Sequence, residues 1–377
     1  MYPTKRSPQQ YPSKAVAFNA QNSGQAKGFQ KRYAGSPFVQ GYKATGGDLP
    51  QENADFLQSE TMWKYLSNKC LKDENETIPE WQKRAPAVIL LGAMKCGTHA
   101  LTESLWEHPL VARNGHWELH FFDNDKPIRT DQGIYASQTR HAYANAFRKA
   151  SPEFFENMVQ RNNDDTSMIA MESSPRYVLS SDRLPHLILC VVPWIKFLVM
   201  VRDPVGRAES QYRYLDEARR AIDKPMVDWE AWIDDDLRLL REAGVFSAQN
   251  RDEERLAWKK YQRRPNSNMI VGRGLYVLQL LDYFEAMDEY GKARSDMLVI
   301  QSERFRHNRQ EEYNGVLQFL GLPPHTLQNA REEIHVTLHK DEAPMPVSTK
   351  RELRKIYHPY NQRLYELLGW SESFQWR

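Results

Sequence analysis

The sequence predicts an α/β fold in which a mainly parallel sheet is flanked by helices, and three observations carry this prediction. Short apolar runs alternate with segments of helical spacing from residue 86 onward. The run at 87–91 passes directly into a glycine-bearing loop and then a helix. A later run, 196–201, ends in Arg-Asp-Pro, which is a typical helix start. In such folds ligands bind at the carboxyl ends of the strands.

Each element has its own signal in the sequence. Apolar residues at helical spacing mark helices, and short apolar runs bounded by turn residues mark strands. In chain order the sequence predicts a helix over 55–70, a strand at 87–91, a helix at 98–108, a strand at 168–171, a strand at 196–201, a helix at 204–220, a helix at 276–290 and a strand at 297–301.

Composition divides the chain into parts. Residues 1–50 are rich in Gln, Ser, Gly, Pro and Lys, with Asp48 as the first acidic residue, and this predicts a disordered basic tail or a processing segment. Residues 51–85 predict an N-terminal helical extension, and residues 86–377 form the main domain. Within it, residues 217–265 are charged and helix-prone, which predicts a helical insertion.

Bulk properties narrow the class of partner and the compartment. The formal net charge of +2 gives no bulk attraction to nucleic acid, so we expect none as a partner. No apolar run in this sequence approaches the roughly 20 residues that cross a bilayer. The N-terminus lacks the apolar centre of a secretory signal. The sequence therefore predicts no membrane anchor and leaves the oligomeric state open.

The cysteines are Cys70, Cys96 and Cys190. They are too few and too scattered to predict a disulfide framework or a metal cluster, and their odd number leaves at least one thiol free or paired between chains. Cys96 precedes a predicted helix start, where a thiol pKa is lowered and the thiol becomes reactive. The alternative, which we favour, is that a small residue was needed there for packing.

A phosphate cradle is predicted where the first strand passes into the first helix. The sequence there reads Gly92-Ala-Met-Lys95-Cys-Gly97-Thr98-His99. Loop N–H groups and the positive end of the helix dipole converge on one point, and Lys95 adds a full charge. An ATP-binding loop places its lysine after the second glycine, whereas Lys95 precedes Gly97. The loop therefore suits a phosphate but departs from the ATP-binding pattern.

A second anion-binding element follows the run at 196–201. Arg202 stands at the strand end and Ser210 lies two turns into the next helix, so both can reach a single phosphate. The simpler interpretation is a strand–helix junction with Asp203 as N-cap and Pro204 at the first helical position. Both interpretations can hold at once.

Together these two stretches resemble the elements that bind 3′-phosphoadenosine 5′-phosphosulfate (PAPS) in the sulfotransferase superfamily. The resemblance covers roughly residues 86–370 and implies the sulfotransferase fold, with a phosphate-loop-like parallel sheet. It implies that the first loop holds the 5′-phosphosulfate through Lys95, Cys96, Gly97, Thr98 and His99. It also implies that Arg202 and Ser210 hold the 3′-phosphate.

A third stretch, Trp117-Glu118-Leu119-His120-Phe121-Phe122-Asp123, resembles a segment of heparan sulfate sulfotransferases in which the glutamate is the proposed catalytic base. An acceptor hydroxyl that attacks sulfur must lose its proton, and a carboxylate can take it. Glu118 and His120 alternate with apolar residues, so they share one face of an extended segment. Without the neighbouring motifs, a solvated strand face is the better explanation of these two residues, and with the motifs the catalytic interpretation is the better one.

Looser matches add further candidates. Glu172-Ser-Ser-Pro-Arg176-Tyr177 resembles a Lys-Thr-Pro segment of the heparan enzymes, with Ser173 in place of the lysine. Gly272-Arg-Gly-Leu-Tyr276 resembles a family segment that precedes a helix beside the cofactor, and a glycine turn that enters a helix explains it equally well. The C-terminal part resembles carbohydrate sulfotransferases that act on N-acetylgalactosamine 4-sulfate residues of chondroitin. That resemblance implies Lys340 as a cofactor contact, and a solvated surface lysine explains it equally well.

The resemblance implies a PAPS-dependent sulfotransferase that modifies a hydroxyl of a carbohydrate of the glycosaminoglycan type. Lys95, Glu118 and His120 are the candidate catalytic residues, and no metal is expected because fixed cations already neutralise the leaving phosphate. Family resemblance implies the Golgi lumen, with the cytoplasm as the alternative. The rival functions are sulfation of small phenolic or sterol-like acceptors, a phosphate-loop ATPase or kinase, and a relative that binds the cofactor without turnover.

Overall fold

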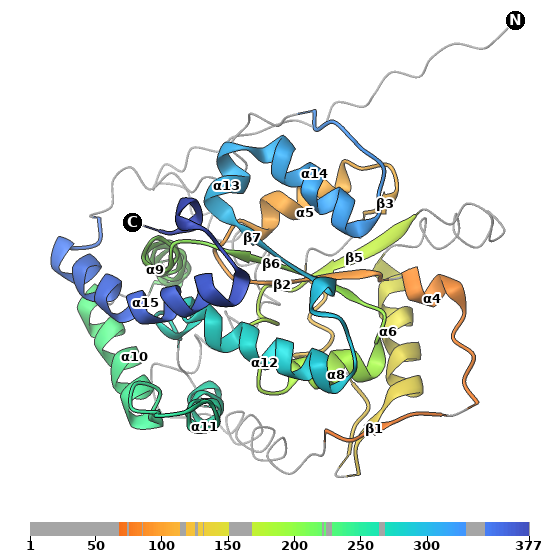
Figure 1. Ribbon diagram of the computed structural model, residues 1–377, viewed down its shortest axis with the longest axis horizontal. Coiled ribbons are helices and arrows are strands. Elements are labelled where there is room, and N and C mark those ends of the chain that lie inside the picture. The colour runs from red at the N-terminus through yellow and green to blue at the C-terminus, as the bar shows by residue number, and fades with distance from the viewer. Residues whose placement is uncertain are drawn as a thin grey trace, which may run out of the picture.

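The computed structural model confirms the predicted α/β fold with a parallel sheet (Figure 1). It describes residues 68–376 apart from 74, 85, 114–117, 125–126, 131, 151–167, 221, 224–227, 264–267 and 329–343. The predicted basic tail, most of the predicted helix over 55–70, and Lys340 lie outside the described residues.

Five parallel strands form the central sheet in the order β3-β5-β2-β6-β7. The strands are β2 (Val88–Gly92), β3 (Val111–Ala112), β5 (Ile169–Ser173), β6 (Lys196–Val201) and β7 (Met297–Gln301). The bounds predicted for β6 and β7 are confirmed. Their apolar runs are continuous because both faces of a parallel sheet are covered.

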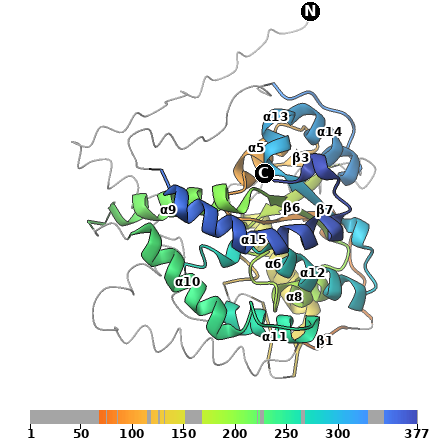
Figure 2. The same cartoon turned by 60° about the vertical axis from the view of Figure 1, so that its left-hand side comes forward.

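Helices cover both faces of the sheet, as Figures 1 and 2 show. One layer holds α5 (Thr98–Trp106), α13 (Ser302–His307) and α14 (Arg309–Leu320). The other holds α6 (Ala136–Ala150), α8 (Leu184–Val191), α12 (Tyr276–Glu289) and α15 (Val347–Leu368). Helix α9 (Pro204–Arg220) has the bounds that its sequence predicts.

The order of the strands marks where a ligand can bind. After β2 the chain turns to one side of the sheet, toward β3 and β5, and after β6 it turns to the other side, toward β7. The direction of winding therefore reverses between β2 and β6, which are neighbours. A crevice opens at the carboxyl ends of the strands at such a switch point.

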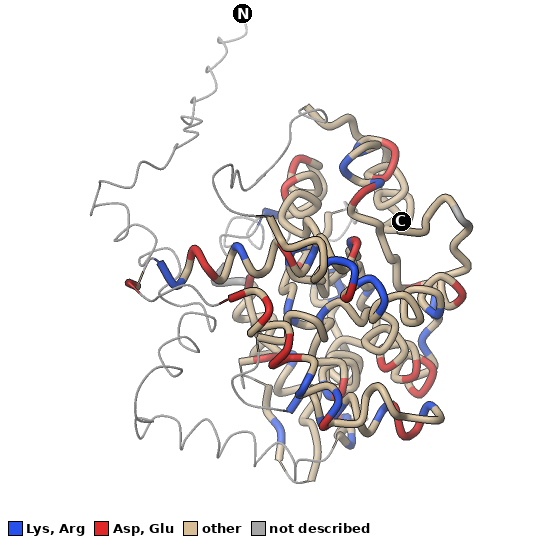
Figure 3. The backbone as a smooth tube through the Cα atoms, turned by 90° about the vertical axis from the view of Figure 1, so that its left-hand side faces the viewer, with Lys and Arg blue, Asp and Glu red and all other residues tan. Residues whose placement is uncertain are grey.

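Two helices lie within the predicted insertion at 217–265, namely α10 (Trp229–Ala243) and α11 (Arg251–Gln262). Ile233, Leu237 and Trp258 of these helices are buried in the same apolar cluster as the central strands. Acidic and basic residues are interspersed over the face drawn in Figure 3, in keeping with the small net charge.

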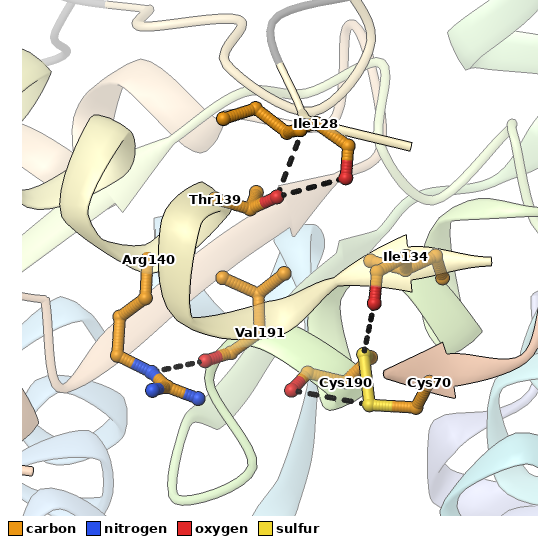
Figure 4. The surroundings of a disulfide bond; sticks show 7 residues. All are labelled: Cys70, Ile128, Ile134, Thr139, Arg140, Cys190 and Val191. Carbon is orange, nitrogen blue, oxygen red and sulfur yellow. Dashed lines mark hydrogen bonds between the residues drawn. A yellow bond between two sulfur atoms is a disulfide. The ribbon is translucent and has the colours of Figure 1, made fainter. Parts of the chain in front are cut away.

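A disulfide joins Cys70 to Cys190 across 120 residues of sequence (Figure 4). Cys70 lies in β1 (Cys70–Leu71), which pairs with β4 (Ile134–Tyr135), and Cys190 lies in α8. The prediction that the helix over 55–70 reaches Cys70 is therefore wrong at that end. The sequence did not predict this bond, because the fold brings together residues that are distant in sequence, whereas the expectation that at least one thiol stays free is met by Cys96.

Replacing both Cys70 and Cys190 by serine should lower the free energy of unfolding by about 2 to 4 kcal/mol, because the bond restricts a long loop of the unfolded chain. Denaturant unfolding monitored by circular dichroism measures the loss. Thiol titration of the unreduced, denatured wild type gives an independent check, with one free thiol expected per chain. Three free thiols would contradict the pairing.

Among residues 68–376, outside the gaps given above, no helix combines the length and apolar character that a bilayer crossing requires.

Candidate active site

The loop between β2 and α5 has the backbone of an anion cradle. Gly97 is the N-cap residue of α5 and has φ +86°, and Lys95 is left-handed as well, with φ +68°. A left-handed conformation is uncommon for a residue with a Cβ and concentrates at functional sites. Thr98 begins the helix, where the first N–H groups have no partner within the helix. The helix dipole therefore points its positive end at this loop.

Lys95 is a partly buried cation held against α9. Its Nζ lies 4.8 Å from the ring centroid of Tyr214. Burial lowers the pKa of Lys95, the charge of Glu217 opposes this change, and the neighbouring charge of Arg202 adds to it. Two cations that share a poorly solvated site favour an anion between them. The electrostatics of the loop thus suit a phosphate or sulfate ester.

The junction between β6 and α9 combines a helix cap with a cation. Asp203 Oδ1 accepts the N–H of Val205 at 3.2 Å and Oδ2 accepts that of Gly206 at 3.1 Å, so the predicted N-cap is confirmed. A Cβ built on Gly206 would lie 3.5 Å from Arg202 Nε. The guanidinium therefore lies against the first turn of α9, and Ser210 follows on the same face, four residues after Gly206.

The fold brings the two predicted anion-binding elements into contact. Arg202 Nη1 donates to the backbone oxygen of Lys95 at 3.4 Å. Tyr276 lies behind both elements, with its hydroxyl donating to the backbone oxygen of Arg202 at 2.9 Å and 3.4 Å from Cys96 Sγ. Because Tyr276 is buried, its side chain joins the elements from within rather than facing a ligand.

Cys96 is a packing residue of the loop. Its side chain is fully buried, and burial raises the pKa of its thiol to about 11. Its N–H donates to the backbone oxygen of Ala93 at 3.1 Å. The structure therefore favours the interpretation that a small residue was needed beside Gly97 over that of a reactive thiol. The thiol and the backbone N–H of Cys96 both contact groups of the protein itself.

A pocket of about 280 Å³ adjoins this junction at the carboxyl ends of β6 and β7. Its lining combines two arginines with aromatic and acidic side chains: Arg202, Asp203, Gly206, Ser302, Glu303, Arg306 and Trp376. The loop between β2 and α5 lies next to this pocket, because a Cβ on Gly97 would be 3.4 Å from Oγ of the lining residue Ser302. Trp376 is fixed by its indole N–H, which donates to Glu303 at 3.1 Å.

Glu118 and His120 form a hydrogen-bonded pair. His120 Nε2 lies 2.7 Å from Glu118 Oε2, and its Nδ1 lies 3.0 Å from Asp123 Oδ2. Burial alone lowers the pKa of His120, but the hydrogen bonds and charges of Asp123 and Glu118 outweigh it and raise the pKa to about 10. His120 is therefore a cation at neutral pH. The side chain of Glu118 is 48% exposed, so it remains open to an acceptor.

Backbone contacts place this pair at the same edge of the sheet as the phosphate loop. The N–H of His120 donates to Ser174 Oγ at 3.2 Å, and Ser174 directly follows β5. The next residue, Pro175, lies so close to Gly92 that a Cβ there would be 2.5 Å from its backbone oxygen. Glycine at 92 thus allows the β5 turn, and with it the Glu118–His120 pair, to lie beside the loop.

Other predicted residues lie less centrally. His99 lies on α5, with its Nε2 3.6 Å from Glu103 Oε1. Lys340 and Trp117 fall outside the described residues. The sequence did not lead us to predict Asp123 as a site residue, although it stands three residues after His120, a spacing that is compatible with a contact between the two side chains. In the described part of the chain, no group of three or more His, Cys, Asp or Glu residues is arranged to hold a metal ion.

The fold and site define an α/β protein of the phosphate-loop class, with a carboxylate–histidine pair beside the loop. Its family follows from comparison with known proteins. The sequence model of the sulfotransferase domain family matches residues 85–348, and the chain belongs to this family. It is therefore a transferase, and PAPS is the sulfate donor of its family.

Two curated relatives show the range of similarity. Human heparan sulfate glucosamine 3-O-sulfotransferase 5 is 27% identical over 305 residues, which cover 78% of this chain and 76% of that protein. Rat carbohydrate sulfotransferase 15 is 25% identical over 323 residues. The match covers 78% of this chain but 54% of the rat protein, so this chain corresponds to about half of it.

Among solved structures, a sulfotransferase from Alicyclobacillus acidocaldarius is similar with a TM-score of 0.48 and 20% identity. The similarity covers 76% of this chain and 97% of that structure.

Proposed function

We propose that this chain transfers a sulfuryl group from PAPS to a hydroxyl of a glycosaminoglycan-like carbohydrate. One observation carries the proposal. At the switch point between β2 and β6, Arg202 contacts the backbone of Lys95 at 3.4 Å, and the Glu118–His120 pair lies beside the same loop. The site thereby combines two anchors for a nucleotide anion with a carboxylate that is open to an acceptor.

The residues of this edge fit PAPS. The two partly buried cations, Lys95 and Arg202, favour anionic groups between them. We assign the 5′-phosphosulfate to Lys95 and the N–H groups at the start of α5, with Gly97, Thr98 and His99. The 3′-phosphate is assigned to Arg202 and Ser210 beside the pocket at β6 and β7. PAPS supplies a sulfuryl group bound to a stable leaving phosphate.

The residues of this chain have separate roles in the transfer. Glu118 accepts the proton of the acceptor hydroxyl as the new oxygen–sulfur bond forms and the bond to the bridging oxygen breaks. Lys95 and the loop N–H groups stabilise the negative charge that grows on the departing phosphate. His120 is already protonated, so its hydrogen bond of 2.7 Å orients the carboxylate of Glu118. Adenosine 3′,5′-bisphosphate leaves as the second product.

The acceptor class follows from the base and from the relatives. Glu118 is exposed, which suits attack by a hydroxyl of a large substrate. The relatives above are named for heparan sulfate glucosamine and for carbohydrate. Sulfotransferases of small phenols, by family resemblance, use a histidine base. His120 is unsuited to that role because its raised pKa keeps it protonated at neutral pH.

The ATPase interpretation finds no support at Asp203. Asp203 is explained as the N-cap of α9, because its two carboxylate oxygens accept backbone N–H groups at the start of that helix. The lysine that precedes Gly97 also departs from the ATP-binding loop.

For the compartment, we propose an oxidising lumen such as that of the Golgi. The Cys70–Cys190 disulfide supports this proposal, because such bonds persist in oxidising compartments and are rare in the cytosol.

Calorimetry and transfer assays test the proposal together. Adenosine 3′,5′-bisphosphate should bind the folded wild-type chain in titration calorimetry. With labelled PAPS as donor, sulfate should pass to desulfated or partly sulfated glycosaminoglycans and not to a phenol. Absence of nucleotide binding in well-folded protein would overturn the proposal, and transfer to the phenol alone would overturn the acceptor class.

A further inference from the structure

A buried carboxylate, Glu172, lies behind the Glu118–His120 pair at the carboxyl end of β5. Its side chain is fully buried, and three hydroxyl groups donate to it. Tyr177 donates to Oε1 at 2.7 Å, Ser174 donates to the same oxygen at 2.8 Å, and Tyr143 of α6 donates to Oε2. A buried carboxylate carries a large desolvation cost, which donors of this kind offset.

Two of these hydroxyls also accept hydrogen bonds from the segment that bears the catalytic pair. Ser174 Oγ accepts the N–H of His120 at 3.2 Å, and the hydroxyl of Tyr177 accepts the N–H of Phe122 at 2.9 Å. Each hydroxyl has one proton, and in both cases it is donated in a hydrogen bond to Glu172. The oxygen lone pairs are thereby turned toward the backbone of 120–122.

We propose that Glu172 is a positioning residue for sulfuryl transfer, which fixes the Glu118–His120 pair through the hydroxyls of Ser174 and Tyr177. The inference rests on the proposed function, since it takes Glu118 as the base. The backbone of His120 is left-handed, with φ +48°, and such a conformation persists where surrounding contacts determine it. The two hydrogen bonds to 120–122 supply such contacts. Glu172 does not touch the acceptor, so its effect is on geometry.

The test compares Glu172→Ala with Glu172→Gln. The alanine variant leaves both hydroxyls free to rotate, and we expect kcat to fall about 30-fold, since small misplacements of reacting groups are costly. The glutamine variant keeps an oxygen that accepts from Ser174 and Tyr177, so it should retain kcat within about threefold of wild type. Affinity for adenosine 3′,5′-bisphosphate, measured by calorimetry, should be unchanged in both.

Asp282 offers a matched control for simple loss of a buried carboxylate. It is buried in α12 and accepts the hydroxyl of Ser181 at 2.5 Å, outside the Glu172 network. Asp282→Asn should reduce thermal stability without reducing kcat. An equal loss of kcat in Asp282→Asn and Glu172→Ala would overturn the positioning role.

A double variant separates positioning from other effects. In a Glu118→Gln background, Glu172→Ala should cause no further loss of kcat, because the group it positions is already absent. Multiplying losses would overturn the inference.

Nuclear magnetic resonance titration of His120 provides a readout that needs no turnover. Glu172→Ala should lower the pKa of His120 as its pairs with Glu118 and Asp123 loosen. If the wild type binds no nucleotide but this shift appears, the proposed function fails while the positioning holds. If nucleotide binds and neither kcat nor the titration changes, the positioning fails alone.

Discussion

Lys95→Ala should abolish measurable sulfuryl transfer, with a loss of about a thousandfold or more in kcat. Lys95 is the one side-chain cation that the sequence places within the loop between Gly92 and Gly97. Charge develops on the leaving phosphate in the transition state, and a fixed cation in a poorly solvated site stabilises it more strongly than it stabilises bound PAPS. Transfer of labelled sulfate under saturating donor and acceptor measures the effect.

Lys292→Ala is a suitable control for this variant. Lys292 also has a largely covered side chain, 7% exposed, and its Nζ lies 2.9 Å from Asp296, away from the switch point. Its replacement should leave transfer unchanged. Both variants add an alanine, so a general effect of losing a lysine would appear in both. If Lys95→Ala weakened nucleotide binding but kept kcat within tenfold, Lys95 would bind the donor without assisting the reaction.

The parts of the fold that sequence predicted well are those with strong local signals. The apolar run at 196–201 and the Asp203-Pro204 start predicted both β6 and α9 with their bounds, because strand burial and helix capping depend on adjacent residues. The loop at Lys95 was likewise readable, since glycine and helix start lie within a few residues.

What the sequence could not show depends on contacts across the fold. Cys70 and Cys190 are 120 residues apart, and only the packing of β1 beside α8 brings them together. Glu172 was noted as part of a family-like segment, but its partner Tyr143 comes from α6. Asp123 and His120 are only three residues apart, but their contact depends on the turn that follows the left-handed backbone of His120, and the sequence does not show that conformation.

Glu118→Gln should lower kcat by about a hundredfold to ten-thousandfold, the range over which a positioned general base contributes. Glutamine has nearly the same shape and can still accept a hydrogen bond from His120, but it cannot take the proton of the acceptor. Affinity for adenosine 3′,5′-bisphosphate should be retained, because Glu118 lies outside the nucleotide-binding elements at Lys95 and Arg202. Transfer assays and calorimetry on the same preparation check both parts.

A control for Glu118→Gln comes from a similar pair elsewhere. Glu289 is also an exposed carboxylate beside a histidine, with its Oε2 3.5 Å from His186 Nδ1, and Glu289→Gln should leave transfer unchanged.

The dependence of kcat on pH distinguishes Glu118 from His120 as the base. Removing Glu118 takes away one of the two carboxylates that raise the pKa of His120, so that pKa should fall from about 10. A neutral His120 could then serve as a base at high pH, and a loss of kcat that persists across pH 7 to 10 would show that the proton goes to Glu118 itself. Undiminished kcat at neutral pH would remove Glu118 from this role.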